Sequence, residues 1–282
     1  MIKAKQFLTT MVFSGLACCI STAAFGWTLV GDFEDGVVGQ KANGSRGMSE
    51  AFGKSIIVDT PVFDGIRGAQ MGIDVTSDGS TQWGGIMNHP VVLREGVELW
   101  YRISTYFPVN FIPVGRPRLK FLRVHTMTTV GTNDGYLDLY ILPNGGFSYD
   151  NEIVSVSTSE NIQTGAPTPF GTPLEKGVWE TYEVYIKFHS QPGMGIYRAW
   201  QNGKLIHENK TLNTLKTPAS WSDRAHIFTY WNSFSNAGAP QTQSMYVDDV
   251  ILTSDRPSCQ DENGNYMIGP AKSTAPGCAS AR

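Results

Sequence analysis

The sequence predicts an all-β protein, a jelly-roll β-sandwich of two curved antiparallel sheets with few helices. Runs of β-branched and aromatic residues alternate with period two, and turn pairs such as Asn144-Gly145 and Asn202-Gly203 separate them. No segment keeps a helical apolar period with caps. Charged residues are only 17%, while there are 30 Gly and 15 Pro. Two packed sheets are the simplest way to bury this many apolar strand faces.

The N-terminal segment has the features of a secretory signal peptide, which we assign to residues 1–26. Two lysines form its charged region, residues 7–20 are mainly apolar, and small residues lead to Ala24-Phe25-Gly26. We therefore expect a secreted or periplasmic protein. The alternative is a lipoprotein acylated at Cys18 or Cys19.

Residues 27–257 are predicted to form one jelly-roll domain. The segment 157–173, rich in Ser, Thr, Gly and Pro, is expected to be a long loop within it. Nine runs are predicted strands, some followed by a tight turn: 55–63, 69–75, 96–108, 119–126, 136–143, 181–189, 195–206, 225–232 and 245–253.

Residues 258–282 are predicted to be a polar C-terminal tail. Removal of the signal peptide leaves Cys259 and Cys278 as the cysteines of the mature chain. Two cysteines in an oxidising compartment are expected to pair. We therefore predict a disulfide bond that closes the tail into a loop and acts as a local staple.

Composition and missing motifs exclude several function classes. The formal net charge of −3 predicts no bulk attraction to nucleic acid or to an anionic membrane. No segment after the signal peptide is apolar enough to span a bilayer, and we expect a monomer. The sequence contains no Gly-x-Ser-x-Gly elbow, His-Glu-x-x-His motif or Walker loop. It also lacks a Glu-x-Asp-x-x-Glu strand, which argues against a retaining glycosidase.

Several strand faces combine side chains that suit acid–base chemistry. Alternation in 181–189 separates an apolar face from a face that carries Tyr185 and Lys187. In 119–126, Arg123 and His125 share a face with apolar residues, and this mixture predicts a β-bulge or a strand end. A plainer interpretation of Tyr185 and Lys187 is an ordinary strand face with an extended lysine.

These residue types match the needs of β-elimination in a uronic acid polymer. A cation or amide must neutralise the carboxylate, a base must take the neighbouring proton, and an acid must protonate the leaving oxygen. His and Tyr suit the proton transfers, while Arg, Lys and Asn suit the carboxylate, and aromatic rings stack on sugars. The candidate substrate-binding residues are Trp83, Trp100, Arg123, Tyr140, Arg198, Trp200, Tyr230 and Asn232.

On these residues the sequence resembles the jelly-roll, concanavalin-like polysaccharide lyases that act on alginate, glucuronan or heparin-type chains. Glu98-Leu99 followed by Arg102, then Arg123-Val124-His125, then Tyr185-Ile186-Lys187 are similar to three strand motifs of alginate lyases. The resemblance implies His125 as base or charge neutraliser, Tyr185 as acid–base, and Arg102 and Lys187 as carboxylate ligands. Arg123 stands where that family has Gln, and Arg102 is offset by one residue.

Acidic residues near both ends of the domain suggest a structural calcium ion. Asp32 and Glu34 lie near the start, whereas Asp248 and Asp249 lie near the end. The first and last strands of a sandwich commonly pair, and clustered carboxylates favour Ca²⁺. Alternatively, these carboxylates accept hydrogen bonds from nearby backbone amides.

Our first hypothesis is therefore an exported lyase that cleaves an acidic polysaccharide by β-elimination in a concave groove. It requires His125, Tyr185, Lys187 and Arg102 to converge. The alternatives are a non-catalytic carbohydrate-binding protein of the same fold and a structural surface protein, because fold alone does not decide function.

Overall fold

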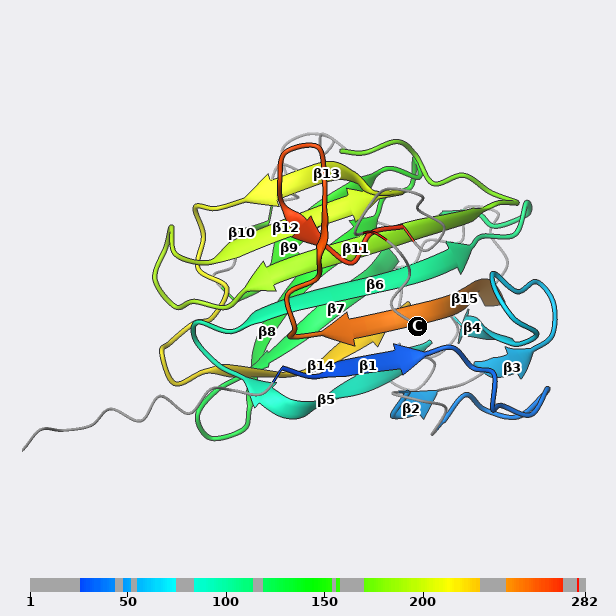
Figure 1. The fold of residues 1–282 in the computed structure, drawn as a ribbon, viewed down its shortest axis with the longest axis horizontal. Coiled ribbons are helices and arrows are strands. Elements are labelled where there is room, and N and C mark those ends of the chain that lie inside the picture. The colour runs from blue at the N-terminus through cyan, green and yellow to red at the C-terminus, as the bar shows by residue number, and fades with distance from the viewer. Residues whose placement is uncertain are drawn as a thin grey trace, which may run out of the picture.

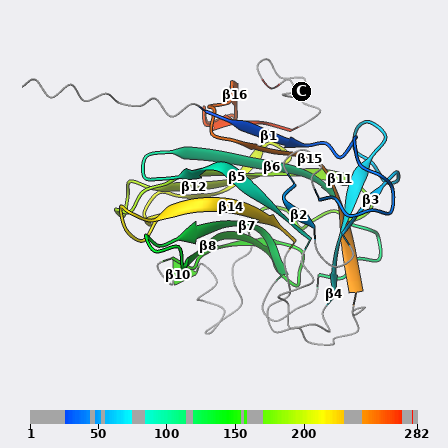
Figure 2. The same ribbon diagram turned by 90° about the horizontal axis from the view of Figure 1, so that it is seen from below.

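The protein is a two-layered β-sandwich, as the sequence predicts (Figures 1 and 2). In the part of the chain that the structure describes there are seventeen strands and no helix. The structure is a computed structural model, and it describes residues 26–43, 48–51, 55–74, 84–113, 119–153, 156–157, 170–228, 242–270 and 278.

The first sheet, sheet A, has eight antiparallel strands. In spatial order these are β13 (Lys204–Asn209), β12 (Ile196–Gln201), β11 (Trp179–Lys187), β6 (Glu98–Tyr106), β15 (Thr242–Thr253), β4 (Gly68–Asp74) and β3 (Ile56–Val58), with β1 (Thr28–Gly31) also paired to β15.

The second sheet, sheet B, has seven antiparallel strands. In order they are β10 (Val156–Ser157), β9 (Phe147–Asn151), β8 (Asn133–Ile141), β7 (Leu119–Met127), β14 (Trp221–Ile227), β5 (Gly85–Leu93) and β2 (Glu50–Ala51). β7 and β14 are bowed, with the outer face of sheet B on the inside of the curve (Figure 2).

The hydrophobic core lies between the sheets and follows from strand alternation. Leu99, Tyr101 and Ile103 of β6 pack in one cluster with Leu137 and Leu139 of β8, and all five are at most 1% exposed. Burying an apolar side chain of this size contributes about 1.5–3 kcal/mol. The alternate residues of the same strands therefore form the two outer faces.

The first and last strands of the domain pair, as expected. Thr28 to Gly31 of β1 lie opposite Thr253 to Val250 of β15. Against β6 the register of β15 shifts between Asp248 and Ile251, and Asp249 has a positive φ of 49°. This bulge turns the Asp249 carboxylate toward Arg102 of β6.

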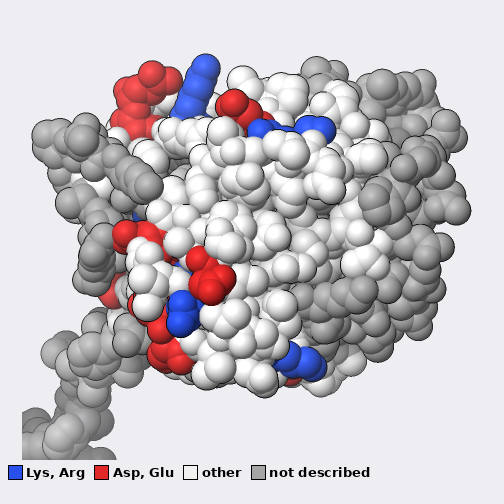
Figure 3. Space-filling model, turned by 90° about the vertical axis from the view of Figure 1, so that its right-hand side faces the viewer, with Lys and Arg blue, Asp and Glu red and all other residues white. Residues whose placement is uncertain are grey.

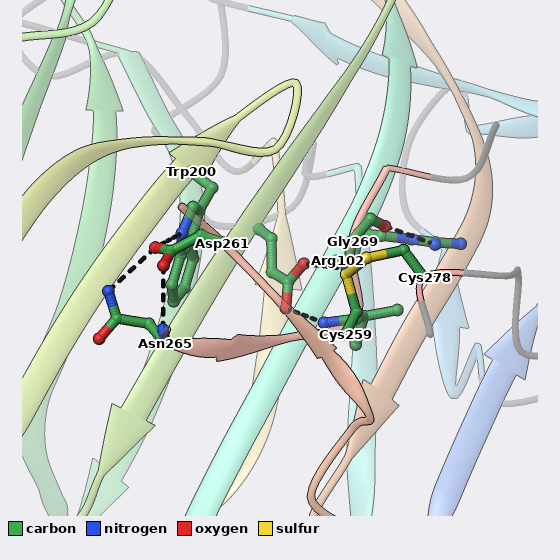
Figure 4. The surroundings of a disulfide bond; sticks show 9 residues. Arg102, Trp200, Cys259, Asp261, Asn265, Gly269 and Cys278 are labelled. Atoms are coloured by element: carbon green, nitrogen blue, oxygen red, sulfur yellow. Dashed lines mark hydrogen bonds between the residues drawn. A yellow bond between two sulfur atoms is a disulfide. The ribbon is translucent and has the colours of Figure 1, made fainter. Parts of the chain in front are cut away.

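The tail crosses the outer face of sheet A. It contains the hairpin of β16 (Cys259–Gln260) and β17 (Tyr266–Met267), and Cys259 is bonded to Cys278 (Figure 4). The predicted disulfide is thus confirmed. The domain boundaries themselves, and the signal peptide, stay predictions. No helix among the described residues is long and apolar enough to cross a membrane.

Candidate functional site

The predicted site residues are divided between the two outer faces of the sandwich. His125, Arg123 and Tyr140 belong to β7 and β8 of sheet B, whereas the other described catalytic and substrate-binding candidates belong to sheet A. The convergence of His125 with Tyr185, Lys187 and Arg102 is therefore a wrong prediction. Its physical cause is strand pairing, because β6 and β11 pair with each other and not with β7. The sheet A candidates are Trp100 and Arg102 of β6, Tyr185 and Lys187 of β11, and Arg198 and Trp200 of β12.

The tail covers the part of the outer face of sheet A that Trp100, Tyr185 and Trp200 form. Trp100, Tyr185 and Trp200 form a second apolar cluster, with Met267 and both disulfide cysteines packed on it. The indole of Trp200 donates a hydrogen bond to Asp261 Oδ2 at 2.9 Å (Figure 4). Tyr185 is 5% exposed, and burial raises the pKa of its phenol. This face therefore binds the protein's own tail.

Two charged residues hold that tail. The Arg102 guanidinium is buried, pairs with Asp249 and donates to the Gly269 carbonyl at 2.9 Å. The Glu183 carboxylate accepts hydrogen bonds from the backbone N–H groups of Ile268 (2.7 Å) and Gly269 (3.0 Å). Arg102 is thus engaged within the fold, and the structure offers no support for its role as a carboxylate ligand of substrate.

On the outer face of sheet B, His125 is the centre of a different cluster. Its Nδ1 lies 2.7 Å from Asp223 Oδ1 and 3.2 Å from Arg224 Nε. Both neighbours come from β14, whose register shifts between Ser222 and Arg224. A bulge sets two residues against one, so Asp223 and Arg224 both reach the histidine.

Tyr136 places a phenol beside His125. The two rings are 4.8 Å apart between centroids, and the Arg123 guanidinium lies 3.6 Å from the Tyr136 ring centroid. Burial raises the pKa of Tyr136, against the nearby charges of Arg123 and Arg224. The phenol is therefore protonated at neutral pH and can act as an acid.

His226 completes the cluster as a neutral imidazole. Its ring lies 5.6 Å from Tyr136 and 6.1 Å from His125 between centroids. Burial lowers its pKa well below the ordinary value, and Arg123 adds to this effect.

A buried ionic network extends the cluster toward β9. Arg123 Nε donates a hydrogen bond to Asp138 Oδ1 at 2.7 Å. The Glu152 carboxylate accepts hydrogen bonds from Arg123 Nη2 (3.2 Å) and Lys120 Nζ (3.0 Å). The Tyr140 hydroxyl donates to Asp138 and Glu152. Burial raises the pKa of Asp138 to about 6, although Arg123 opposes it. The cations here are balanced by carboxylates, so this network braces the sheet.

The predicted bulge in β7 is present between Lys120 and Leu122. It allows Lys120, Arg123 and His125 to share the outer face, opposite Tyr140, Asp138 and Tyr136 of β8. Four residues of this cluster are not among the candidates predicted from the sequence: Tyr136, Asp223, Arg224 and His226. Tyr136 could have been found from the sequence, because alternation puts it on the same strand face as Asp138 and Tyr140. Asp223 could not, because the bulge in β14 breaks the alternation at that residue.

Two of the four proposed calcium ligands, Asp248 and Glu34, accept hydrogen bonds from backbone amides. Asp248 Oδ2 accepts from the N–H groups of Phe63 (3.0 Å) and Asp64 (3.3 Å). Glu34 Oε1 accepts from Ile66 and Arg67, at 3.0 and 3.1 Å. Among the described residues no three His, Cys, Asp or Glu side chains gather as a metal site. These contacts fit the alternative of amide-binding carboxylates, and calcium stays a prediction without structural support.

Three candidates, Trp83, Tyr230 and Asn232, lie outside the described residues. Figure 3 shows the side of the molecule on which β3 lies. On the described part of that surface, Lys and Arg form no large patch, and the charged side chains lie in small separate groups.

The fold is that of a β-sandwich protein, and comparison with known proteins identifies its family. Residues 44–250 match the family model described as polysaccharide lyase. The chain therefore belongs to the polysaccharide lyase family, is a lyase, and has a polysaccharide as its substrate.

Solved structures of lyases share its fold. The endo-β-1,4-glucuronan lyase of the fungus Trichoderma reesei is 16% identical, with a TM-score of 0.53, over 80% of this chain and 94% of that one. A mutant of alginate lyase Aly36B in complex with alginate trisaccharide is 15% identical, with a TM-score of 0.55, over 80% and 97%. The marine alginate lyase of Aplysia kurodai is 10% identical, with a TM-score of 0.51, over 70% and 86%. A search of curated proteins found no match.

Proposed function

We propose that the protein is an exported lyase that cleaves a uronic acid polysaccharide by β-elimination on the outer face of sheet B. The observation that supports this most is the meeting of His125, Tyr136 and Arg224 on that face. A base, an acid and a cation are the three groups that this reaction requires. The solved structures of similar fold that act on glucuronan and alginate also favour a uronate substrate.

In the proposed reaction, Arg224 binds the uronate carboxylate and makes the neighbouring C5 proton more acidic. His125 Nε2 takes that proton, a double bond forms between C4 and C5, and the C4–O bond breaks. The Tyr136 hydroxyl protonates the departing oxygen. Because the His125 side chain is only 2% exposed, we place the sugar directly against Tyr136 and Arg224, which border it.

The test is to incubate the purified protein with alginate, glucuronan and heparin-like polymers, and with a neutral glucan as control. We expect the ultraviolet absorbance of an unsaturated uronate to rise with at least one acidic polymer, and the neutral glucan to give none. The His125→Gln variant should give no rise. Binding of these polymers without any new absorbance would contradict the proposal and favour the non-catalytic carbohydrate-binding alternative.

A further inference from the structure

We propose that Asp223 is the positioning residue of this site: it keeps a proton on Nδ1 of His125 and so leaves Nε2 free to act as the base. This inference rests on the proposed function for its kinetic consequences. Its structural part, the position of the proton on the imidazole, can be measured without any substrate.

The geometry comes from the bulge in β14. Ser222 pairs with Thr126 and Arg224 pairs with His125, so Asp223 is the extra residue between two successive pairs on β7. In a regular strand Asp223 and Arg224 would point to opposite faces. Here both contact the same imidazole, which is a feature that bulges supply next to active sites.

The two contacts of Nδ1 make opposite demands on it. Arg224 Nε–H needs a lone pair on Nδ1, whereas the Asp223 carboxylate needs a proton there, and one neutral ring cannot satisfy both. The Asp223 contact is shorter, at 2.7 Å against 3.2 Å. Arg224 Nε also lies 3.5 Å from Asp223 Oδ2. The guanidinium can therefore pair with the Asp223 carboxylate and does not need the lone pair of Nδ1.

Asp223 is ionised at neutral pH, as this role requires. Burial alone would raise its pKa, but the hydrogen bond with His125 and the positive charges of His125, Arg224 and His89 together lower it. When Nε2 takes a proton, the ring becomes an imidazolium, and Asp223 is the neighbouring anion that stabilises it. The titratable and charged groups that face His125 are His89 of β5, Arg123 of β7, Tyr136 of β8, and Asp223, Arg224 and His226 of β14.

The Asp223→Asn variant tests the proposal. The amide can donate to Nδ1 and hold the ring with its proton on Nε2, which would block the base. We expect kcat to fall about 10²- to 10⁴-fold with little change in KM. The pH profile of any remaining activity should differ from that of the wild type, because the His125 imidazolium has lost its neighbouring anion. Asp223→Glu should restore part of kcat.

Nitrogen NMR of the imidazole rings measures which nitrogen of His125 carries the proton. Replacing a residue with a purely structural role would not change this result. The His125 signals are assigned by their absence in His125→Gln. In the wild type we expect the proton on Nδ1 at neutral pH, and in Asp223→Asn on Nε2. A wild-type protein with the proton on Nε2 overturns the proposal, even if Asp223→Asn does not fold.

The matched control is Glu95→Gln, which neutralises the acid of another histidine–carboxylate pair, His189 Nε2 to Glu95 Oε1 at 3.1 Å. It should keep the wild-type pH profile. If the wild type is active and Asp223→Asn keeps the wild-type pH profile and His125 tautomer, the role of Asp223 is refuted while the proposed function stands. A wild type that cleaves no polymer would instead refute the proposed function, and the NMR result would still decide where the proton lies.

Discussion

At the scale of single residues, two bulges determine which side chains reach the candidate site. The bulge in β7 lets Lys120 and Arg123 share a face although they are three positions apart. The bulge in β14 brings Asp223 to His125. Each bulge is one extra residue, so a single insertion or deletion here would redirect every later side chain of the strand.

Tyr136→Phe tests the proposed acid. The change removes one hydroxyl and keeps the ring on which the Arg123 guanidinium stacks. We therefore expect polymer binding and the melting temperature to stay near wild type, while kcat falls about 10²- to 10⁴-fold. Steady-state absorbance kinetics and a binding assay on the same polymer measure the two effects separately.

Tyr185→Phe is the matched control. It also removes one phenol hydroxyl, but from the face that the tail covers. We expect nearly unchanged kcat. Loss of turnover in this variant, with Tyr136→Phe active, would move the site to sheet A and contradict the proposed function.

Residue-level alternation explains which part of the site was predictable. The prediction that Arg123 and His125 share a face is correct, because alternation holds along short regular segments. Strict alternation would put Lys120 on the face of Leu122, but the β7 bulge lies between them and turns Lys120 to the other face. The contact of Asp223 with His125 could not be predicted from alternation for the same reason, because a bulge leaves no periodic pattern in a single sequence.

At the scale of elements, each of the nine predicted runs overlaps an observed strand, and the Asn202-Gly203 turn is confirmed. Asn202 and Gly203 have φ values of 53° and 80°, and they join β12 to β13.

β5 was missed because Pro90 interrupts its pattern. The proline is tolerated because no pairing to β2 or β14 is made at its position. Sheet membership was not predictable, because it depends on pairing between strands far apart in sequence.

The tail is the element whose attachment we expect to depend on pH, through Glu183. Burial raises the pKa of this carboxyl to about 7, although the Ile268 and Gly269 amides oppose it. Between the ordinary value of 4.5 and about 7, the folded state binds a proton that the unfolded state has released. The contribution of Glu183 to stability therefore falls as pH rises through this range, by about 3 kcal/mol in all.

Glu183→Gln tests this linkage. Glutamine resembles the protonated acid, so we expect the variant to match wild type near pH 5 and to be more stable than wild type near pH 8. Denaturant unfolding at both pH values measures the difference. The lowered pKa values of His89 and His207, both about 4, give an opposite slope, but it is common to both proteins and cancels. An unfolding difference that does not change with pH would contradict the prediction.

At the scale of the whole molecule, the two outer faces have separate tasks. Sheet A binds the disulfide-closed tail through aromatic rings, Arg102 and Glu183. Sheet B carries the polar cluster around His125. The all-β fold and the lyase family were predictable from the sequence, because they depend on local alternation and on a broad resemblance. The division between the faces was not, because aromatic and cationic strand faces look alike whether they bind a sugar chain or a tail.

The separation of the faces predicts that the tail stabilises the protein without taking part in the reaction. A double variant, Cys259→Ser with Cys278→Ser, removes a cross-link between residues 19 positions apart, which should cost about 3 kcal/mol of stability. We expect a lower melting temperature and altered fluorescence of Trp100 and Trp200, which lie beneath the tail. Below the melting transition, kcat/KM should stay within about twofold of wild type, because distant sites act nearly independently. Tyr136→Phe should show the opposite pattern, with stability kept and turnover lost. A folded double variant without activity would mean that the tail, and the face beneath it, contribute to the site.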